Sequence, residues 1–374
     1  MDNNSWLLLQ EQEAGHRLPQ DLAARDPFGA RDCGWVEQMR PFIRQFCPEG
    51  GLLLDPFCGF GTTLMAAHLE GRRGIGVELE PARAGIAQER MSRAGAACQS
   101  VLAGDSVKAA AQLPPVDLVL TNIPYFGCRW PEEGDAQLYN STTYAAFLEQ
   151  IYLVFKALKP VVREGGYVIV MAENLRIGQH FVPMAWDVAR ILSERYDLVD
   201  ERILLYERAR QPVPALQVQS NRAHEYALIA RNQAHAIDLQ ASLSCLRALA
   251  AAFPDFVVYG SYARWLHGEA LERLPSDVDL LVPDDIEQLQ KLVLWFEAQG
   301  FQIARWGAPL ASRAVPLAAN AAHYFRAQRL RASGELCVID VCFEDAEISY
   351  PAALSQATAL GGLKVLPSAR GTHS

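Results

Sequence analysis

Asp55-Pro56-Phe57-Cys58-Gly59-Phe60-Gly61-Thr62-Thr63 is the stretch of this 374-residue chain that predicts its fold. It follows the apolar run 52–54 and leads directly into the helix-like segment 64–69. A strand, a glycine-containing turn and a helix start, in that order, form a ligand-binding corner of an open α/β sheet. Glycine lets the backbone approach a ligand, and the side chain of Thr62 or Thr63 can cap the helix. The pattern therefore predicts a ligand site at the end of a strand.

Polar or acidic residues end the three strand-like segments that follow. Segment 73–79 carries Glu78, about twenty residues after the glycines, where a carboxylate can accept both hydroxyl groups of a ribose. The next segment ends at Asp105, which can accept from an adenine amine. Segment 116–120 runs directly into Thr121-Asn122-Ile123-Pro124-Tyr125. Groups suited to a ligand or to chemistry thus follow four consecutive strands.

Two of these motifs resemble a known family. Residues 55–63 resemble the S-adenosylmethionine motif of DNA amino-methyltransferases, and residues 122–125 resemble the catalytic (Asp/Asn/Ser)-Pro-Pro-(Tyr/Phe) motif of that family. Residues 221–229 resemble its closing strand, so that the resemblance covers residues 17–232. It implies a Rossmann-like class I methyltransferase sheet with S-adenosylmethionine as cofactor. The implied cofactor-binding residues are Asp55, Phe57, Gly59, Gly61, Thr62, Glu78 and Asp105, and the implied catalytic residues are Asn122, Ile123, Pro124 and Tyr125.

The residue chemistry is compatible with methylation of an exocyclic amine. The lone pair of such an amine is delocalised into the ring, and acceptors that hold its hydrogens direct that lone pair at the sulfonium methyl group. The Asn122 side-chain oxygen and the Ile123 carbonyl are the predicted acceptors. Pro124 stiffens the turn, and Tyr125 offers a face on which a flipped-out base can stack. Ile123 stands where the family has proline, a change that keeps the carbonyl and alters the rigidity of the loop.

The last third of the chain carries a second signature. A predicted strand enters the turn Gly260-Ser261, and another predicted strand carries Asp277 and Asp279 at alternate positions. This spacing places both carboxylates on one face, where like charges are costly unless a cation neutralises them. Asp340, between apolar neighbours, can complete the cage from an adjacent strand.

This pattern resembles the DNA polymerase beta-like nucleotidyltransferase superfamily. The resemblance implies that Gly260 and Ser261 hold a nucleoside triphosphate and that the three aspartates bind magnesium. Two metal ions would then stabilise the attacking and leaving oxygens of a nucleotidyl transfer. The spacing between the two motifs is longer than in the minimal members of the superfamily. An exposed acidic loop and a degenerate, purely structural copy are the alternative interpretations.

Length and composition indicate two domains. A chain of 374 residues is too long for one typical core, and half of its residues are hydrophobic, which is enough for two. We expect an α/β methyltransferase domain over residues 1–232 and a smaller α+β nucleotidyltransferase-like domain over residues 241–374. The eight cysteines show no zinc-ligand spacing, and the apolar run 6–9 is too short to span a membrane. The chain is therefore expected to be a cytoplasmic enzyme without a membrane partner.

The net charge of −9 bears on the choice of substrate. Neutralisation of phosphates supplies most nonspecific affinity for duplex DNA, and neither half of this chain is basic. By resemblance, nucleic acid is the favoured substrate, DNA before RNA. The alternatives are methylation of a small molecule, RNA or a protein amide, and metal-dependent nucleotidyl transfer to a small molecule or partner protein as the main activity. The predicted loops 127–143, 172–181 and 206–220 are the material left for recognition of a target.

Overall fold

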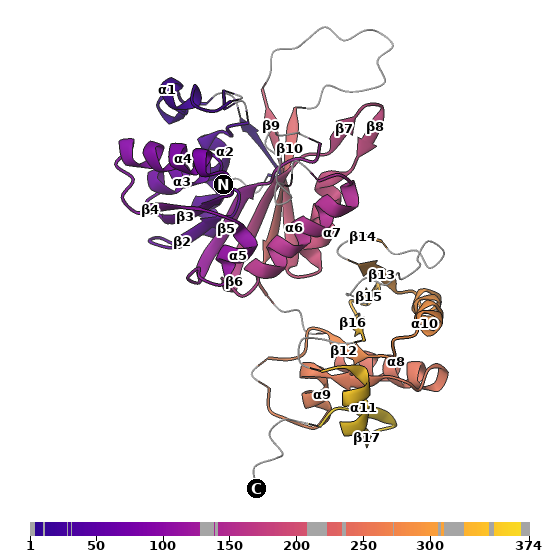
Figure 1. Cartoon of the computed structure of the whole chain (residues 1–374). Helices are drawn as coiled ribbons and strands as arrows, with labels where there is room; N and C mark the ends of the chain where they lie inside the picture. Colours follow the sequence, from indigo (N-terminus) through magenta and orange to yellow (C-terminus); the bar gives the residue numbers. More distant parts are fainter. Residues whose placement is uncertain are drawn as a thin grey trace. The chain divides into compact units, whose positions relative to one another are not determined.

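The computed structural model describes residues 4–9, 12–27, 29–30, 32–127, 138, 141–207, 223–233, 237–271, 273–305, 308–309, 325–343 and 348–367. The chain divides into two compact units, Met1–Gln233 and Ala234–Ser374, each with its own sheet and its own apolar core (Figure 1). Most of the predicted loops 127–143 and 206–220 lies outside the described residues.

The first unit is built on an eight-stranded sheet in the order β1-β9-β10-β6-β5-β2-β3-β4. Strands β4, β3, β2, β5 and β6 are parallel neighbours, whereas β10 is antiparallel to both β6 and β9. The Rossmann-like α/β sheet predicted from the sequence is thus confirmed. The strands are β1 (Trp6–Leu9), β2 (Leu52–Asp55), β3 (Arg73–Glu78), β4 (Gln99–Ala103), β5 (Val116–Asn122), β6 (Val162–Ala172), β9 (Asp197–Tyr206) and β10 (His224–Arg231).

The order of the strands reverses between β2 and β5, which are neighbours in the sheet although β3 and β4 lie between them in sequence. At such a switch point the following connections leave in opposite directions, and a crevice opens at the carboxyl ends of the strands. The predicted ligand motifs lie at this edge, because one follows β2 and the other follows β5.

Helices cover both faces of this sheet (Figure 1). On one face, α2, α3 and α4 share a core with sheet residues such as Leu118 and Leu120. On the other side lie α5, α6 and α7, with α6 packed against α5 and α7. Burial on both faces explains why β2 is continuously apolar, Leu52-Leu53-Leu54. The helices of this unit are η1 (Ala14–His16), α1 (Gln20–Ala23), α2 (Val36–Phe46), α3 (Thr62–Leu69), α4 (Pro81–Arg93), α5 (Ser106–Ala110), α6 (Tyr144–Leu158) and α7 (Met184–Ser193).

The predicted loop 172–181 contains regular structure. It forms a hairpin of β7 (Leu175–Ile177) and β8 (His180–Val182), with Ile177 opposite His180. A three-residue strand is too short to show a clear alternation of apolar and polar residues, so the sequence pattern did not reveal it. Among the described helices, none combines the length and the apolar character needed to cross a membrane.

The second unit combines helices with a mixed eight-stranded sheet in the order β14-β13-β15-β16-β12-β11-β18-β17. Strand β12 runs parallel to β16 and antiparallel to β11, and β15 runs antiparallel to β16. Its resemblance to nucleotidyltransferases stays a prediction. The elements are α8 (Leu239–Ala252), β11 (Val257–Tyr259), α9 (Gly260–Leu266), β12 (Val278–Leu281), α10 (Ile286–Ala298), β13 (Gln302–Arg305), β14 (Ala308–Pro309), β15 (Phe325–Leu330), β16 (Leu336–Cys342), α11 (Tyr350–Gln356), β17 (Thr358–Leu360) and β18 (Leu363–Val365).

Candidate functional site

A cavity of about 920 Å³ lies at the carboxyl ends of β2, β3 and β5 in the first unit. This volume is in the range of cofactor and small-molecule pockets. The cavity brings the two predicted motifs together, although three strands and three helices lie between them in sequence. The predicted residues that line it are Asp55, Phe57, Gly59, Thr62, Glu78, Asp105, Asn122, Ile123, Pro124 and Tyr125.

The two glycines of the turn after β2 have different environments. Both adopt left-handed conformations, with φ of +50° at Gly59 and +75° at Gly61. A Cβ atom added at Gly59 would meet no atom within 4 Å, and Gly59 lines the cavity. A Cβ atom at Gly61 would lie 3.4 Å from Met91 and 3.5 Å from Ala87 of α4. Gly61 was predicted to approach the cofactor, but it lies outside the cavity lining and permits close packing of the turn on α4.

The start of α3 also differs from the prediction. Gly61 is the N-cap residue, and no side chain caps this helix. The Thr62 hydroxyl donates instead to the carbonyl of Gly34, at 3.3 Å, and accepts from Arg90 at 3.4 Å. The prediction that Thr62 or Thr63 caps α3 is therefore wrong, because Thr62 is turned toward the N-terminal segment.

Glu78, the last residue of β3, braces the glycine turn. Its two carboxylate oxygens accept from the backbone N–H groups of Gly59, at 2.8 Å, and Glu80, at 3.0 Å. Burial raises the pKa of Glu78, and these two hydrogen bonds act against that shift. Each carboxylate oxygen can accept a further hydrogen bond. The side chain predicted to hold a ribose therefore also sets the shape of the turn.

Asp55 and Asp105 are fixed by neighbouring donors. The buried Oδ1 of Asp55 accepts from the Thr121 hydroxyl, at 2.6 Å, and from the backbone N–H of Phe57, at 3.0 Å. Burial raises the pKa of Asp55 to about 6. Asp105 caps α5 by accepting from the backbone N–H of Val107, at 2.7 Å. Both carboxylates thus stabilise a corner that follows a strand, in addition to lining the cavity.

The predicted catalytic loop begins at the end of β5. Asn122 lies opposite Met171 of β6 in the parallel ladder, and the backbone N–H of Ile123 donates to the Met171 carbonyl at 3.3 Å. Ile123 is buried, whereas Asn122, Pro124 and Tyr125 are half-buried. The sheet therefore holds the first two residues of the loop at the cavity edge.

Glu225 is a cavity residue that the sequence analysis missed. It accepts from the Tyr125 hydroxyl (3.3 Å), from the Tyr206 hydroxyl (2.9 Å) and from the side-chain amide of Gln38 (2.6 Å). Strand β10 is antiparallel, so its first residues lie where the parallel strands end. Burial and the nearby Glu225 raise the pKa of Tyr125, which keeps its hydroxyl neutral. The sequence signal for Glu225 is an acid at the second position of a strand, directly before the apolar run 226–230.

Two buried arginines of α4 hold the N-terminal segment beside the glycine turn. Arg83 pairs with Asp32, at 2.8 Å, and its guanidinium carbon lies 4.6 Å from the ring centroid of Phe60. Arg90 donates to the carbonyl of Phe60, at 3.0 Å, and to the carbonyl of His16, at 2.7 Å. Asp32 and the residues after it up to position 35 line the cavity. The N-terminal segment is therefore one wall of the candidate site.

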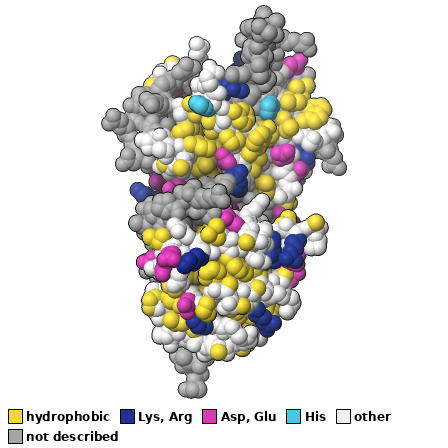
Figure 2. Space-filling view, turned by 90° about the vertical axis from the view of Figure 1, so that its right-hand side faces the viewer, with side chains coloured by type: hydrophobic (Ala, Val, Ile, Leu, Met, Phe, Trp, Pro, Cys, Tyr) yellow, Lys and Arg dark blue, Asp and Glu magenta, His cyan; other side chains and the backbone are white. Residues whose placement is uncertain are grey.

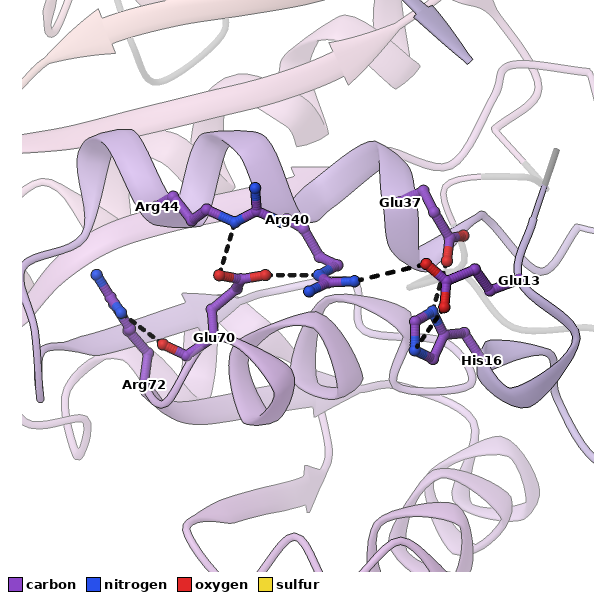
Figure 3. Close-up of polar contacts among 7 residues, drawn as sticks. All are labelled: Glu13, His16, Glu37, Arg40, Arg44, Glu70 and Arg72. Atoms are coloured by element: carbon purple, nitrogen blue, oxygen red, sulfur yellow. Dashed lines mark hydrogen bonds and ion pairs between the residues drawn. The ribbon is translucent and has the colours of Figure 1, made fainter. Parts of the chain in front are cut away.

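A charged network links α2 to its neighbours (Figure 3). Arg40 of α2 donates to Glu70 at the end of α3, and His16 lies between Glu13 and Glu37. Glu13, His16 and Glu37 are of residue types that bind metal ions. However, Glu37 faces Nδ1 of His16, at 2.5 Å, whereas Glu13 faces Nε2, at 3.6 Å. Because each carboxylate faces a different ring nitrogen, we interpret this group as a network that fastens the N-terminal segment to α2.

In the second unit the structure brings the predicted acids together. Asp279 of β12 lies opposite Asp340 of β16, and a Cβ atom added at Gly260 would lie 2.2 Å from Oδ2 of Asp279. Arg326 of β15 lies opposite Asp340. It donates to both oxygens of Asp340, at 2.7 and 2.6 Å, and to Oδ2 of Asp277, at 3.0 Å. Arg326 belongs to neither motif, so the sequence pattern did not reveal it.

This arrangement does not fit the predicted magnesium site. Magnesium binds carboxylate oxygens at about 2.0–2.1 Å with octahedral geometry. Both oxygens of Asp340 and one oxygen of Asp277 already accept from the buried guanidinium of Arg326. Ser261, predicted to hold the triphosphate, follows Gly260 in α9. The Gly-Ser turn and the acids are adjacent as predicted, but the cation among the acids is an arginine.

Part of the first unit is similar to known methylases. Residues 36–89, which run from α2 through the glycine turn into α4, match the family described as DNA methylase. Over 70 residues the chain is 37% identical to YubD, a candidate methylase of Escherichia coli (strain K12). That match covers 19% of this chain and 31% of YubD, so the chain spans less than a third of the length of this relative.

Solved structures match about half of this chain at low sequence identity. TrmN from Thermus thermophilus matches 57% of this chain and 52% of its own, with 18% identity and a TM-score of 0.40. Precorrin-6y C5,15-methyltransferase from Geobacter metallireducens GS-15 matches 54% of this chain and 90% of its own, with 12% identity and a TM-score of 0.38.

Proposed function

We propose that residues 1–232 form an S-adenosylmethionine-dependent methyltransferase that acts on an exocyclic amine of a nucleic-acid base, with DNA favoured over RNA. The observation that carries this proposal is the meeting of the glycine turn, Glu78 and the loop 122–125 in one cavity. The match of residues 36–89 to DNA methylases supports it, because that segment contains both the turn and Glu78.

The residues present fit the cofactor. Gly59 leaves open space at the turn, Glu78 offers acceptors for ribose hydroxyls, and Asp105 offers an acceptor for an adenine amine. When bound, S-adenosylmethionine supplies an electrophilic methyl group on a sulfonium. The segment 32–35 and Phe57 also line the cavity.

The loop after β5 would hold the methyl acceptor. The Asn122 side-chain oxygen and the Ile123 carbonyl accept the amine hydrogens, so that the nitrogen lone pair is aimed at the methyl group. The ring of Tyr125 stacks on the target base, and the hydrogen bond from its hydroxyl to Glu225 fixes the ring in position. Proximity and alignment then account for most of the rate.

Surface charge favours a second class of acceptor. The chain carries a net charge of −9, and acidic and basic side chains are interspersed on the face shown in Figure 2. A protein that neutralises many phosphates needs clustered cations. Methylation of a small molecule or a protein amide is therefore the alternative to methylation of a nucleic acid.

Two measurements on the full-length protein test these proposals. Calorimetry with S-adenosylmethionine and with S-adenosylhomocysteine tests the cofactor; absence of heat with both would refute the methyltransferase. Transfer of a labelled methyl group to DNA, RNA, protein and metabolite fractions identifies the acceptor. We expect Asn122→Ala to bind S-adenosylhomocysteine normally and to lose methyl transfer by at least about 100-fold. Unchanged turnover would remove Asn122 from the mechanism.

A further inference from the structure

Three neighbouring strands of the second unit place an arginine and two acids in one row. Arg326 of β15 lies opposite Asp340 of β16, and Asp340 lies opposite Asp279 of β12. Residues directly opposite each other on adjacent strands point to the same face of a sheet. Asp277 directly precedes β12, and a hydrogen bond from Arg326 to its Oδ2, at 3.0 Å, places it beside these residues. The register of the sheet therefore directs Arg326 at the acid cluster Asp277, Asp279 and Asp340.

The contact between Arg326 and the cluster has the geometry of a strong ion pair. Nε and Nη2 of Arg326 donate to the two oxygens of Asp340, and the same Nη2 also donates to Asp277. A guanidinium fork matches a carboxylate in this two-pronged arrangement. Arg326 is 9% exposed and Asp340 is 6% exposed, so water contributes little to the neutralisation of either charge.

We propose that Arg326 takes the place of a metal ion in the acid cluster, which is a structural ion-pair network and does not bind magnesium. A magnesium ion in the cluster would have to share the carboxylates of Asp340 and Asp277 with the guanidinium of Arg326, so that two cations would repel each other at one site. Displacing Arg326 would leave a permanent positive charge buried without its partners, which is strongly unfavourable. The cluster is therefore stable without a divalent ion.

The pairing of Arg326 with Asp340 bears on the chemistry that the second unit can perform. Two-metal nucleotidyl transfer requires carboxylates that bridge the ions. A magnesium ion bridged by Asp340 would lie beside the buried guanidinium of Arg326, and the repulsion between the two cations opposes such a bridge. Of the interpretations open from the sequence, the structure therefore favours a module that keeps the shape of the acid cluster without its metal chemistry. The inference is independent of the proposed methyltransferase.

Titration of the full-length protein with MnCl₂ tests the inference, because Mn²⁺ takes the same oxygen ligands as magnesium. We expect the heat of Mn²⁺ binding to be the same in the wild type and in Asp340→Asn. We also expect the same Tm for the wild-type protein in excess EDTA and in millimolar Mn²⁺. Saturable Mn²⁺ binding by the wild type that Asp340→Asn abolishes would overturn the inference.

A second variant tests the role of the arginine directly. Arg326→Gln removes the cation and leaves the acids, so the Tm should fall by roughly 5–10 °C. Mn²⁺ should then restore part of that loss, because the cluster becomes free to bind it. Arg331→Gln, at an exposed arginine that pairs with Glu335, is the matched control and should change neither the Tm nor the response to Mn²⁺. If Arg326→Gln does not fold, the comparison of wild type with Asp340→Asn still decides the question.

Discussion

The hydroxyl of Tyr125 donates to Oε1 of Glu225 at 3.3 Å, although the two residues are 100 positions apart in sequence. Oε2 of Glu225 accepts from Gln38 and Tyr206 at the same time. One carboxylate therefore ties the predicted catalytic loop to α2, β9 and β10. Within the proposed methyltransferase, Glu225 is a positioning residue that acts through Tyr125.

Substitution of Glu225 should lower turnover more than cofactor affinity. Glu225→Ala removes the acceptor for Tyr125, Tyr206 and Gln38, so we expect kcat to fall by roughly 10–100-fold, with S-adenosylhomocysteine affinity within about threefold of the wild type. Glu225→Gln keeps one acceptor oxygen and should recover part of the loss. Initial rates and calorimetry measure the two effects, with Glu201→Gln on the exposed side of β9 as control. Normal kcat in Glu225→Ala would contradict the positioning role.

Glu78 should control cofactor binding. Glu78→Ala removes a carboxylate that holds the turn through Gly59 and is proposed to hold the ribose. The loss of hydrogen bonds to a charged group predicts weaker S-adenosylhomocysteine binding by roughly 10–100-fold. Calorimetry provides the test, and Glu287→Gln, an exposed glutamate of the second unit, is the control for the loss of one negative charge. Equal affinity in Glu78→Ala and wild type would rule out this role.

Substitution of the two glycines of the turn should affect cofactor binding to different extents, although both positions are left-handed. Gly61→Ala places a Cβ atom against Met91 and Ala87 in a left-handed conformation, so the free energy of unfolding should fall by about 1–3 kcal/mol. Gly59→Ala adds its methyl group in open space beside the cavity, so it should weaken cofactor binding more than Gly61→Ala does. Denaturant unfolding and calorimetry on both variants measure the two quantities. The reverse ranking of the two variants for cofactor affinity would contradict this assignment.

Asp55 should make stability depend on pH. Its pKa is raised to about 6 from 3.8, so the folded protein binds more protons than the unfolded chain between these values. The free energy of unfolding should therefore decrease as the pH rises from about 4 to about 6, by roughly 3 kcal/mol in total. Above that range the contribution of Asp55 should not change further. Asp55→Asn removes this titration while keeping an oxygen for Thr121. The difference in unfolding free energy between variant and wild type should change across this window, and a constant difference would exclude Asp55 as its source.

Local sequence patterns were sufficient to predict most of the structure of the first unit. The strand–turn–helix around Gly59 and the strand that ends at Asn122 are each encoded within about ten consecutive residues, so hydrophobic periodicity and turn residues are sufficient to predict them. Parallel strands then bring their carboxyl ends to one edge, and the cavity lies there. The prediction of a threonine cap on α3 was wrong because Gly34 and Arg90 orient the Thr62 side chain, and both residues are distant from it in sequence.

By itself, the sequence determined the α/β class of the first unit and the places where its strands end, because these depend on neighbouring residues. Only the tertiary structure decided that Glu225 meets Tyr125 and that Arg326 lies between Asp340 and Asp277. The physical reason is register. The alternation within one strand determines which face a side chain occupies, but the pairing of strands far apart in sequence determines which charges meet on that face.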